Sequence, residues 1–185
     1  MSEPVDVVLD LETFGTAIDS AVVSIGAASL GGSRYSRVIG NPSGAVDAGA
    51  IRWWLQQRVE VRDAVLFGSA EREVLEDFAR WMDDQHAIAD GRGAKFRVWG
   101  SEDFDTAILA SAYRRNGMSV PWHYQQARGL RTILDIAGVD EDAIPWEGIE
   151  HIAVDCAVHA AAALRVALTV LAPADMEAAA KEHTG

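Results

Sequence analysis

Near its N-terminus the chain reads VDVVLDLETFG over residues 5–15, an apolar run that carboxylates interrupt and a glycine closes. Such a run, rich in β-branched residues and ending at a turn residue, predicts a buried strand over residues 5–11. Residues two apart on a strand share a face, so Asp10 and Glu12 project together while Leu9 and Leu11 point the other way. Two carboxylates on a buried face are costly unless a cation compensates them, whereas on a half-wet strand they are ordinary exposed acids.

The segments that follow continue this strand into an α/β pattern. Two further runs, residues 21–30 and 35–39, are joined by Gly31-Gly32 and predict strands that extend an antiparallel meander. Apolar residues then recur at helical spacing in four segments, which are 48–66, 71–84, 106–116 and 152–171. Between them the sequence predicts a short strand at 96–99, a helical turn at 131–136, and loops at 90–93 and 138–148. The prediction from this pattern is an α/β fold with a mixed sheet, in which the antiparallel meander is followed by parallel strands, flanked by helices.

Length and composition limit the classes of function. A chain of 185 residues is the size of one domain, expected over residues 1–172, with a C-terminal helical tail over residues 173–185. The net charge of −12 disfavours nonspecific coating of nucleic acid, but it is compatible with local binding of nucleic acid through metal ions that carboxylates hold. A single cysteine, Cys156, cannot form an internal disulfide and agrees with a reducing compartment.

The sequence also predicts where the protein works. No apolar run approaches the roughly 20 residues that span a bilayer. The first residues, Met1 to Asp6, lack the basic region of a signal peptide. We therefore expect a cytoplasmic protein with no membrane partner.

Two later segments carry groups that could join Asp10 and Glu12. Asp105 follows a short strand and opens a helix, where it is either a further ligand or an ordinary N-cap. His151 and Asp155 are four residues apart near the start of the last helix and so share a face, although a lone histidine there is often structural. Several carboxylates beside a histidine suit phosphodiester hydrolysis with two metal ions, in which hard oxygen ligands favour Mg²⁺ or Mn²⁺ and His151 takes a proton from the attacking water.

With these residues in place, the sequence resembles the DEDDh 3′–5′ exonucleases of the ribonuclease H-like superfamily, and within them the phage-type branch similar to DexA. An ordered set of motifs across about residues 5–170 carries the resemblance: 10–16 (DLETFGT), 23–27 (VSIGA), 53–57 (WWLQQ), 99–105 (WGSEDFD), 121–122 (PW) and 151–157 (HIAVDCA). The resemblance implies two divalent metal ions, Mg²⁺ or Mn²⁺, and stepwise release of nucleoside monophosphates from a single-stranded or 3′-ended nucleic acid. It also makes a homodimer one candidate assembly.

Residue by residue, the resemblance gives Asp10, Glu12 and Asp105 the role of metal ligands and His151 that of general base. It makes Thr13, Phe14 and Gly15 substrate contacts. Adjacent residues on a helix face different ways, so one residue of the pair Trp53-Trp54 can pack inward while the other stacks on a terminal base, a role predicted here for Trp54. Core packing of both is the alternative.

The fourth acid departs from the family pattern. The family's ligand lies five residues after the histidine, where this chain has Cys156, and Asp155 stands immediately before it. Asp155 can take over after a small helix shift, Cys156 can itself bind a metal, preferably Mn²⁺ or Zn²⁺, or the protein binds nucleic-acid ends without cutting them. We favour a 3′–5′ exonuclease of retained but weakened activity with Asp155 as the fourth ligand; a metal phosphoesterase acting on nucleotides is the third hypothesis.

Overall fold

A computed structural model describes residues 2–101 and 103–172 of the chain. The predicted C-terminal helical tail at residues 173–185 lies outside the described residues.

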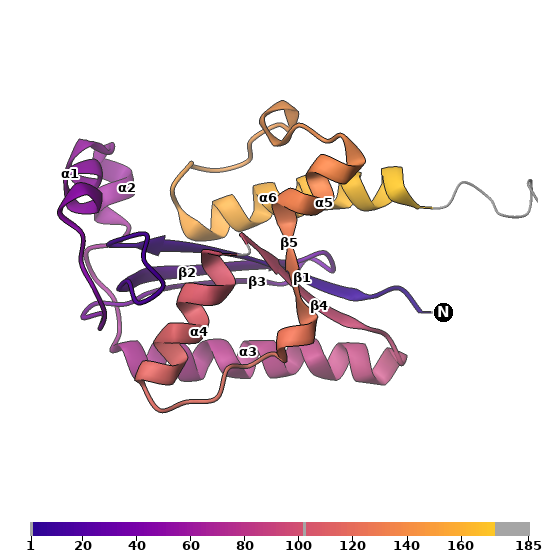
Figure 1. Ribbon diagram of the computed structural model, residues 1–185, viewed down its shortest axis with the longest axis horizontal. Coiled ribbons are helices and arrows are strands. Elements are labelled where there is room, and N and C mark those ends of the chain that lie inside the picture. The colour runs from indigo at the N-terminus through magenta and orange to yellow at the C-terminus, as the bar shows by residue number, and fades with distance from the viewer. Residues whose placement is uncertain (1, 102, 173–185) are drawn as a thin grey trace, which may run out of the picture.

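Five strands form one mixed sheet in the order β3-β2-β1-β4-β5 (Figure 1). β1, β2 and β3 pair antiparallel, whereas β4 runs parallel to β1 and β5 runs parallel to β4. The strand bounds are β1 (Val5–Thr13), β2 (Val22–Ser29), β3 (Arg34–Val38), β4 (Phe96–Gly100) and β5 (Ala127–Gly129). The predicted fold class is confirmed, and β5 is an addition, because its three residues carry none of the β-branched bulk that marks a strand.

Helices cover both faces of the sheet and one end of it (Figure 1). α3 (Glu71–Arg92) and α4 (Asp105–Arg115) lie on one face, and α5 (Leu130–Ala137) and α6 (Ala153–Leu171) lie on the other. α1 (Ala48–Gln56) and α2 (Val59–Asp63) stand at one end, and two short 3₁₀ helices span Tyr124–Gln126 and Glu141–Ala143.

The helix α3 is longer than the sequence predicts. Its buried stripe continues from Phe78 through Met82 to Ala89, so the helix runs through the expected loop at residues 90–93. It ends only at Gly93, whose φ of 59° is the left-handed conformation that glycine adopts readily.

The alternation along β1 sends its polar residues toward α6. Val7, Leu9 and Leu11 belong to the core shared with α3 and α4, whereas Val8 packs with α6. Asp6, Asp10 and Glu12 have the same parity as Val8 and therefore face α6. Of these, Asp6 is paired within the fold: its oxygens accept bonds from Arg97 Nε at 2.6 Å, Arg97 Nη2 at 2.7 Å and Trp99 Nε1 at 2.6 Å.

The helix α6 corrects one expectation from the sequence. Over its 19 residues the mean hydropathy is 1.6, so by length and composition it could cross a membrane. In this fold Ala157, Ala163 and Leu164 are fully buried against the sheet. The alanines of α6 let it approach the sheet closely, and they also raise its mean hydropathy. A helix packed on the sheet therefore has the length and hydropathy of a membrane span.

Candidate active site

Three side chains with metal-ligating atoms converge where β1 meets the first turn of α6. One carboxylate oxygen each of Asp10 and Glu12 and the Cys156 sulfur all lie within 4.8 Å of one another. Glu12 is 8% exposed, and a register shift between Glu12 and Thr13 ends the regular pairing of β1 with β2 at this point. The predicted common face of Asp10 and Glu12 is confirmed, and it is Cys156 that joins them.

A glycine lets α6 come this close to β1. Gly26 on β2 is the cross-strand partner of Asp10. A Cβ at Gly26 would lie only 2.1 Å from the Ala153 carbonyl carbon and 2.3 Å from the Val154 nitrogen. The absence of a side chain at this position therefore allows the start of α6 to seat beside Asp10 and to carry Cys156 into the cluster.

The carboxylate of Asp105 approaches the same place from β4. Asp105 is the first residue of α4, and its oxygens accept the backbone N–H of Ser101 at 2.7 Å and of Leu11 at 3.2 Å. The bond from Leu11 fixes Asp105 against the strand that bears Asp10 and Glu12. The alternative of an ordinary N-cap is wrong, because the N-cap of α4 is Phe104 and neither bond of the Asp105 carboxylate comes from an N–H of α4.

His151 lies before α6 rather than within it. The helix begins at Ala153 after the N-cap Ile152, and His151 has a left-handed φ of 68°. A non-glycine residue in this region costs about 1 kcal/mol or more, and such residues gather at functional sites. The imidazole lines a cavity of about 220 Å³ together with Asp10, Asp105 and Cys156.

Because His151 is outside the helix, the expected shared face of His151 and Asp155 does not form. The Asp155 Oδ2 atom accepts the backbone N–H of Ile149 at 2.9 Å, and a Cβ on Gly148 would lie 2.5 Å from that oxygen. Asp155 thus holds the loop that leads into α6, and it is not among the residues that converge with Asp10 and Glu12.

The predicted substrate contacts divide into supporting and accessible residues. The Thr13 hydroxyl donates to the Gly15 carbonyl at 2.6 Å, and Trp54 Nε1 donates to the Thr13 carbonyl at 2.9 Å. Trp54 is 6% exposed and meets the half-buried Phe14 edge-on, so it supports the turn after β1 and offers no free ring face. It is Trp53, 39% exposed, that lies beside the site, with its ring centroid 4.8 Å from that of His151.

The carboxylates of the site repel one another in a poorly solvated place. Burial, followed by the charges of Asp105 and Glu12, raises the pKa of Asp10 well above its usual range. Burial and the Asp105 charge raise the pKa of Glu12 to about 8. Burial also raises the pKa of Asp105 to about 6, although its bonds from Ser101 and Leu11 and the charge of Arg131 oppose this. Such a cluster is stable as charged groups only beside compensating positive charge.

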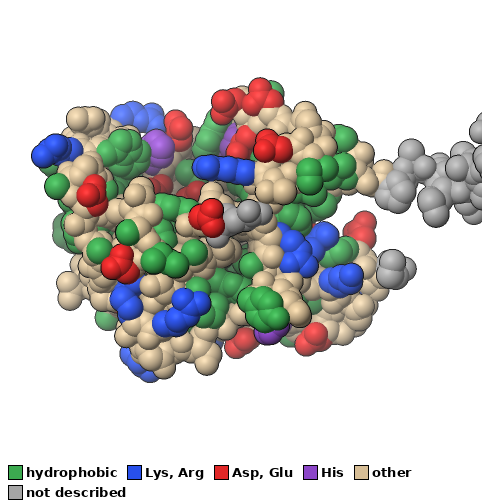
Figure 2. Space-filling view, in the orientation of Figure 1, with side chains coloured by type: hydrophobic (Ala, Val, Ile, Leu, Met, Phe, Trp, Pro, Cys, Tyr) green, Lys and Arg blue, Asp and Glu red, His purple; other side chains and the backbone are tan. Residues whose placement is uncertain are grey.

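The surface shows the same gathering of charge. Figure 2 shows red acidic and purple histidine side chains in a hollow between α1 and the loop that crosses over α5 and α6, with a blue basic side chain at its edge. Two carboxylates and a thiol with converging donor atoms fit a divalent cation, and Asp105 can add oxygen ligands on the neighbouring strand end.

A protein-family model matches residues 5–168, and its description is 3'-5' exoribonuclease Rv2179c-like domain. The chain belongs to this family. The match covers the whole sheet and nearly all of α6, so it includes every residue of the site. Membership in the Rv2179c-like family makes the protein a 3′–5′ exonuclease domain, in agreement with the resemblance seen in the sequence. Among curated proteins, none matches the chain.

Two residues beside this Rv2179c-like site are not among the site residues predicted from the sequence. Trp53 was passed over in favour of its neighbour Trp54, although the pair itself was a signal. Arg131 lines the cavity that also holds Asp10 and His151, and it is the only arginine or lysine among the lining residues that the structure describes.

The raised carboxylate pKa values predict how stability depends on pH. A carboxyl group whose pKa is higher in the folded than in the unfolded protein stabilises the fold when protonated, and this stability is lost as pH rises through the folded pKa. For Glu12 the loss runs from about pH 4.5 to about pH 8, and for Asp105 it runs from about pH 3.8 to about pH 6. We expect the Tm of the metal-free protein to fall by on the order of 5–10 °C between pH 5.5 and 8.5, and Mn²⁺ to restore most of it at pH 8.5.

Thermal unfolding in EDTA and in Mn²⁺ across this range measures the effect, with Glu12→Gln as the comparison because it removes one titrating group. The variant should show a flatter profile in EDTA. If Tm fell with pH at the same slope in both proteins, Glu12 would not be the group that causes the loss of stability.

Proposed function

We propose that the protein is a metal-dependent 3′–5′ exonuclease of the DEDDh type, which removes nucleoside monophosphates from the 3′ end of single-stranded RNA by a two-metal mechanism. The observation that carries the proposal is the convergence of Asp10, Glu12 and Cys156, with Asp105 beside them and His151 in the same cavity. The family supports RNA as substrate, since its description names exoribonuclease activity. The order of motifs favours the DexA-like branch.

The ligands proposed for the two metals are Asp10, Glu12, Asp105 and Cys156. Divalent cations held there would stabilise charge on the phosphodiester oxygens and make an attacking water more acidic. The burial of these carboxylates keeps bulk water from screening that charge.

His151 is the proposed general base. Its imidazole is accessible in the cavity, and the edge of Trp53 packs against the ring and limits its rotation. The left-handed backbone at His151 turns the chain so that the side chain enters the cavity just before α6 begins. In this role the imidazole takes a proton from the attacking water as the phosphodiester bond breaks.

The terminal nucleotide has a natural place beside the turn after β1. Phe14, which is half-buried, and the exposed Trp53 flank the carboxylates there and provide aromatic surface for the terminal base. Thr13, Gly15 and Trp54 hold this surface in position through their hydrogen bonds.

Cys156 sets the choice of metal. A thiolate is a softer ligand than a carboxylate, so this site should favour Mn²⁺ over Mg²⁺. We expect the wild-type protein to cleave RNA faster in Mn²⁺, and Cys156→Asp to raise the Mg²⁺-supported rate by about 10-fold or more. Steady-state rates in the two metals measure this, with Asp155→Asn as the control, which should weaken the loop before α6 without changing the ratio of the two rates.

Cys156 also supports a second candidate function. If Cys156 disables the centre, the protein binds 3′ ends without cutting them, and only Cys156→Asp is active in either metal. A wild-type protein that is active in Mn²⁺ contradicts this alternative, and a Cys156→Asp protein whose ratio of rates is unchanged contradicts the role of the thiol.

The experiment that tests the proposed function separates RNA from DNA and exonuclease from phosphoesterase. Products from single-stranded RNA, single-stranded DNA and a nucleotide p-nitrophenyl ester are resolved by chromatography. The proposal expects nucleoside 5′-monophosphates as the first products from RNA; internal fragments, or turnover of the ester alone, would overturn it.

A further inference from the structure

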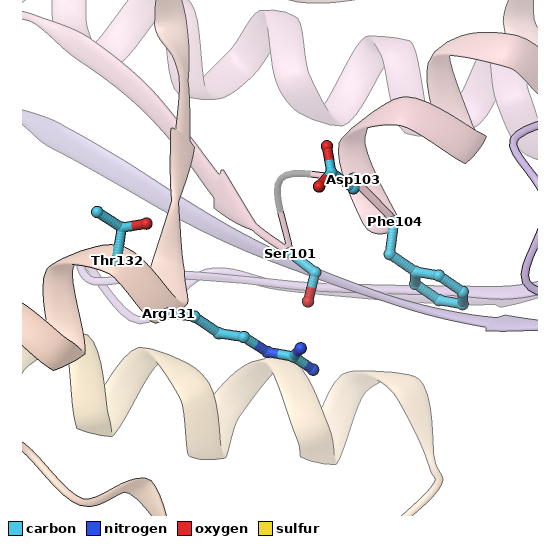
Figure 3. A pocket seen from close by; sticks show the side chains of 5 residues that line it. All are labelled: Ser101, Asp103, Phe104, Arg131 and Thr132. Atoms are coloured by element: carbon cyan, nitrogen blue, oxygen red, sulfur yellow. The ribbon is translucent and has the colours of Figure 1, made fainter.

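A second cavity opens beside the carboxylates, between the end of β4 and the start of α5. It has a volume of about 450 Å³ and is lined by Ser101, Asp103, Phe104, Arg131 and Thr132 (Figure 3). Its size is within the range of about 300–1,000 Å³ that is typical of small-molecule pockets. Ser101 and Arg131 also line the cavity that holds Asp10 and His151, so the two cavities adjoin.

Arg131 is the only arginine or lysine among the described residues that line the two cavities. Figure 3 shows its side chain running from the start of α5 beneath Ser101, while Asp103 points away from it. Within the described part of the chain, no hydrogen bond or ion pair holds the Arg131 guanidinium. A guanidinium offers five N–H donors in a planar fork, which suits a phosphate group.

Phe104 supplies an aromatic surface in the same cavity. The residue is half-buried: part of its ring packs against the core that α3 and α4 share with the sheet, and part lines the cavity. Its position immediately before Asp105 and α4 fixes it relative to the carboxylates. Bases of single-stranded nucleic acid stack on aromatic rings placed in this way.

The order of strands places this cavity on one side of the carboxylates and the turn after β1 on the other. Thr13 pairs with Val22 and the Phe14 N–H bonds to the Ala21 carbonyl, so that turn lies on the β2 side of β1. Ser101 follows β4 and Arg131 follows β5, both on the opposite side of β1. A nucleic-acid chain whose terminal nucleotide lies at Phe14, and which passes over Asp10 and Glu12, therefore leads toward Arg131.

We propose that Phe104 and Arg131 form a binding subsite for the nucleotide that precedes the terminal one: Phe104 stacks on its base, and Arg131 binds the phosphate on its 5′ side. The inference rests on the proposed exonuclease function and deepens it, because a subsite for the leaving strand makes the protein prefer nucleic-acid chains over single nucleotide esters.

The test compares Arg131→Ala with Arg128→Ala. Arg128 lies three residues earlier on the same segment, bonds among the described residues to the Gln125 and Ala127 carbonyls, and lines neither cavity. The substrates are a 5′-labelled oligoribonucleotide and the p-nitrophenyl ester of thymidine 5′-monophosphate, which has no second nucleotide. Arg131→Ala should lower kcat/KM for the first cleavage of the RNA by about 10- to 100-fold more than it lowers kcat/KM for the ester. Arg128→Ala should change neither.

Modified RNAs assign the two contacts separately. A neutral methylphosphonate between the second and third nucleotides from the 3′ end should slow the wild type and have no further effect on Arg131→Ala. An abasic second nucleotide should slow the wild type about 10-fold or more and leave Phe104→Leu almost unaffected.

Two kinds of result would overturn the subsite. Equal losses by Arg131→Ala on RNA and ester would mean that Arg131 acts only through Asp105. If the methylphosphonate slowed cleavage equally in wild type and Arg131→Ala, the phosphate contact would be excluded. If the abasic nucleotide slowed cleavage equally in wild type and Phe104→Leu, the stacking contact would be excluded. A wild type that cleaves neither substrate overturns the proposed function instead, and the subsite is then decided by RNA affinity, which Arg131→Ala must lower for the unmodified RNA but not for the methylphosphonate.

Discussion

Replacing Glu12 by Gln should abolish RNA cleavage, by about 1,000-fold or more, without weakening the fold. The glutamine keeps the shape of the side chain and removes a negative charge that a metal would need. Glu12 is buried beside other carboxylates, and its pKa of about 8 shows that its charge is unfavourable in the metal-free protein. The Tm in EDTA at pH 8.5 should therefore stay the same or rise. Cleavage rates and thermal unfolding on the same preparation measure both effects.

Asp6 is the matched control, because it lies on the same strand and points toward the same helix. Its carboxylate is satisfied by Arg97 and Trp99, so Asp6→Asn leaves the half-buried Arg97 guanidinium incompletely paired and should cost about 1–3 kcal/mol of stability. The folded Asp6→Asn protein should cleave RNA at close to the wild-type rate. If Glu12→Gln retained cleavage, or lost it only as far as it lost stability, Glu12 would be a structural residue.

Replacing Gly26 by Ala should displace the start of α6. The new Cβ would overlap the backbone of Ala153 at 2.1 Å, and backbone atoms cannot rotate away as the end of a flexible side chain can. We expect a loss of about 3 kcal/mol or more, a fall in Tm of roughly 6–12 °C, and a decrease in RNA cleavage of about 100-fold at a temperature where the variant is folded. The activity falls because Cys156 and His151 move with the helix start.

Gly91→Ala is the control for this substitution. Gly91 lies in the last turn of α3 with no atom within 4 Å of its added Cβ, so alanine should be neutral or stabilising by up to about 1 kcal/mol. Chemical denaturation of the two variants gives the free energies of unfolding directly. Equal stability of the two would mean that α6 can approach β2 without the glycine, and the account of how Cys156 reaches Asp10 would be wrong.

The sheet and the carboxylate pair were predictable because these predictions do not depend on the precise ends of a strand. Side chains alternate every residue along β1, so Asp10 and Glu12 share a face wherever the strand begins or ends. The hydrophobic runs of β1, β2 and β3 and the glycines between them were enough to predict the antiparallel meander. The three-residue strand β5 could not be found, since its pairing depends on β4 being beside it.

The helical part of the site was not predictable to the residue. Each step along a helix turns the side chain by about 100°, so the first helical residue decides which group faces the sheet. The sequence predicted a helix over residues 152–171, with His151 near its start, and favoured Asp155 as the fourth ligand. The helix begins at Ala153, after the left-handed residue His151, and it is Cys156 that lies with Asp10. Trp53 and Trp54 lie about 100° apart on α1, and the packing of that helix, which the sequence does not show, decides that Trp54 is the buried one. Arg131 required the tertiary fold, because it reaches the site from the end of β5.

The measurement that tests the central claim most directly is a time course on 5′-labelled single-stranded RNA, run with metal-free protein, with Mn²⁺ added, and with Glu12→Gln in Mn²⁺. The account predicts a ladder that shortens from the 3′ end only when wild-type protein and Mn²⁺ are both present. A ladder that persists in EDTA, or one of equal rate in Glu12→Gln, would contradict a metal-dependent centre built on Asp10, Glu12 and Cys156.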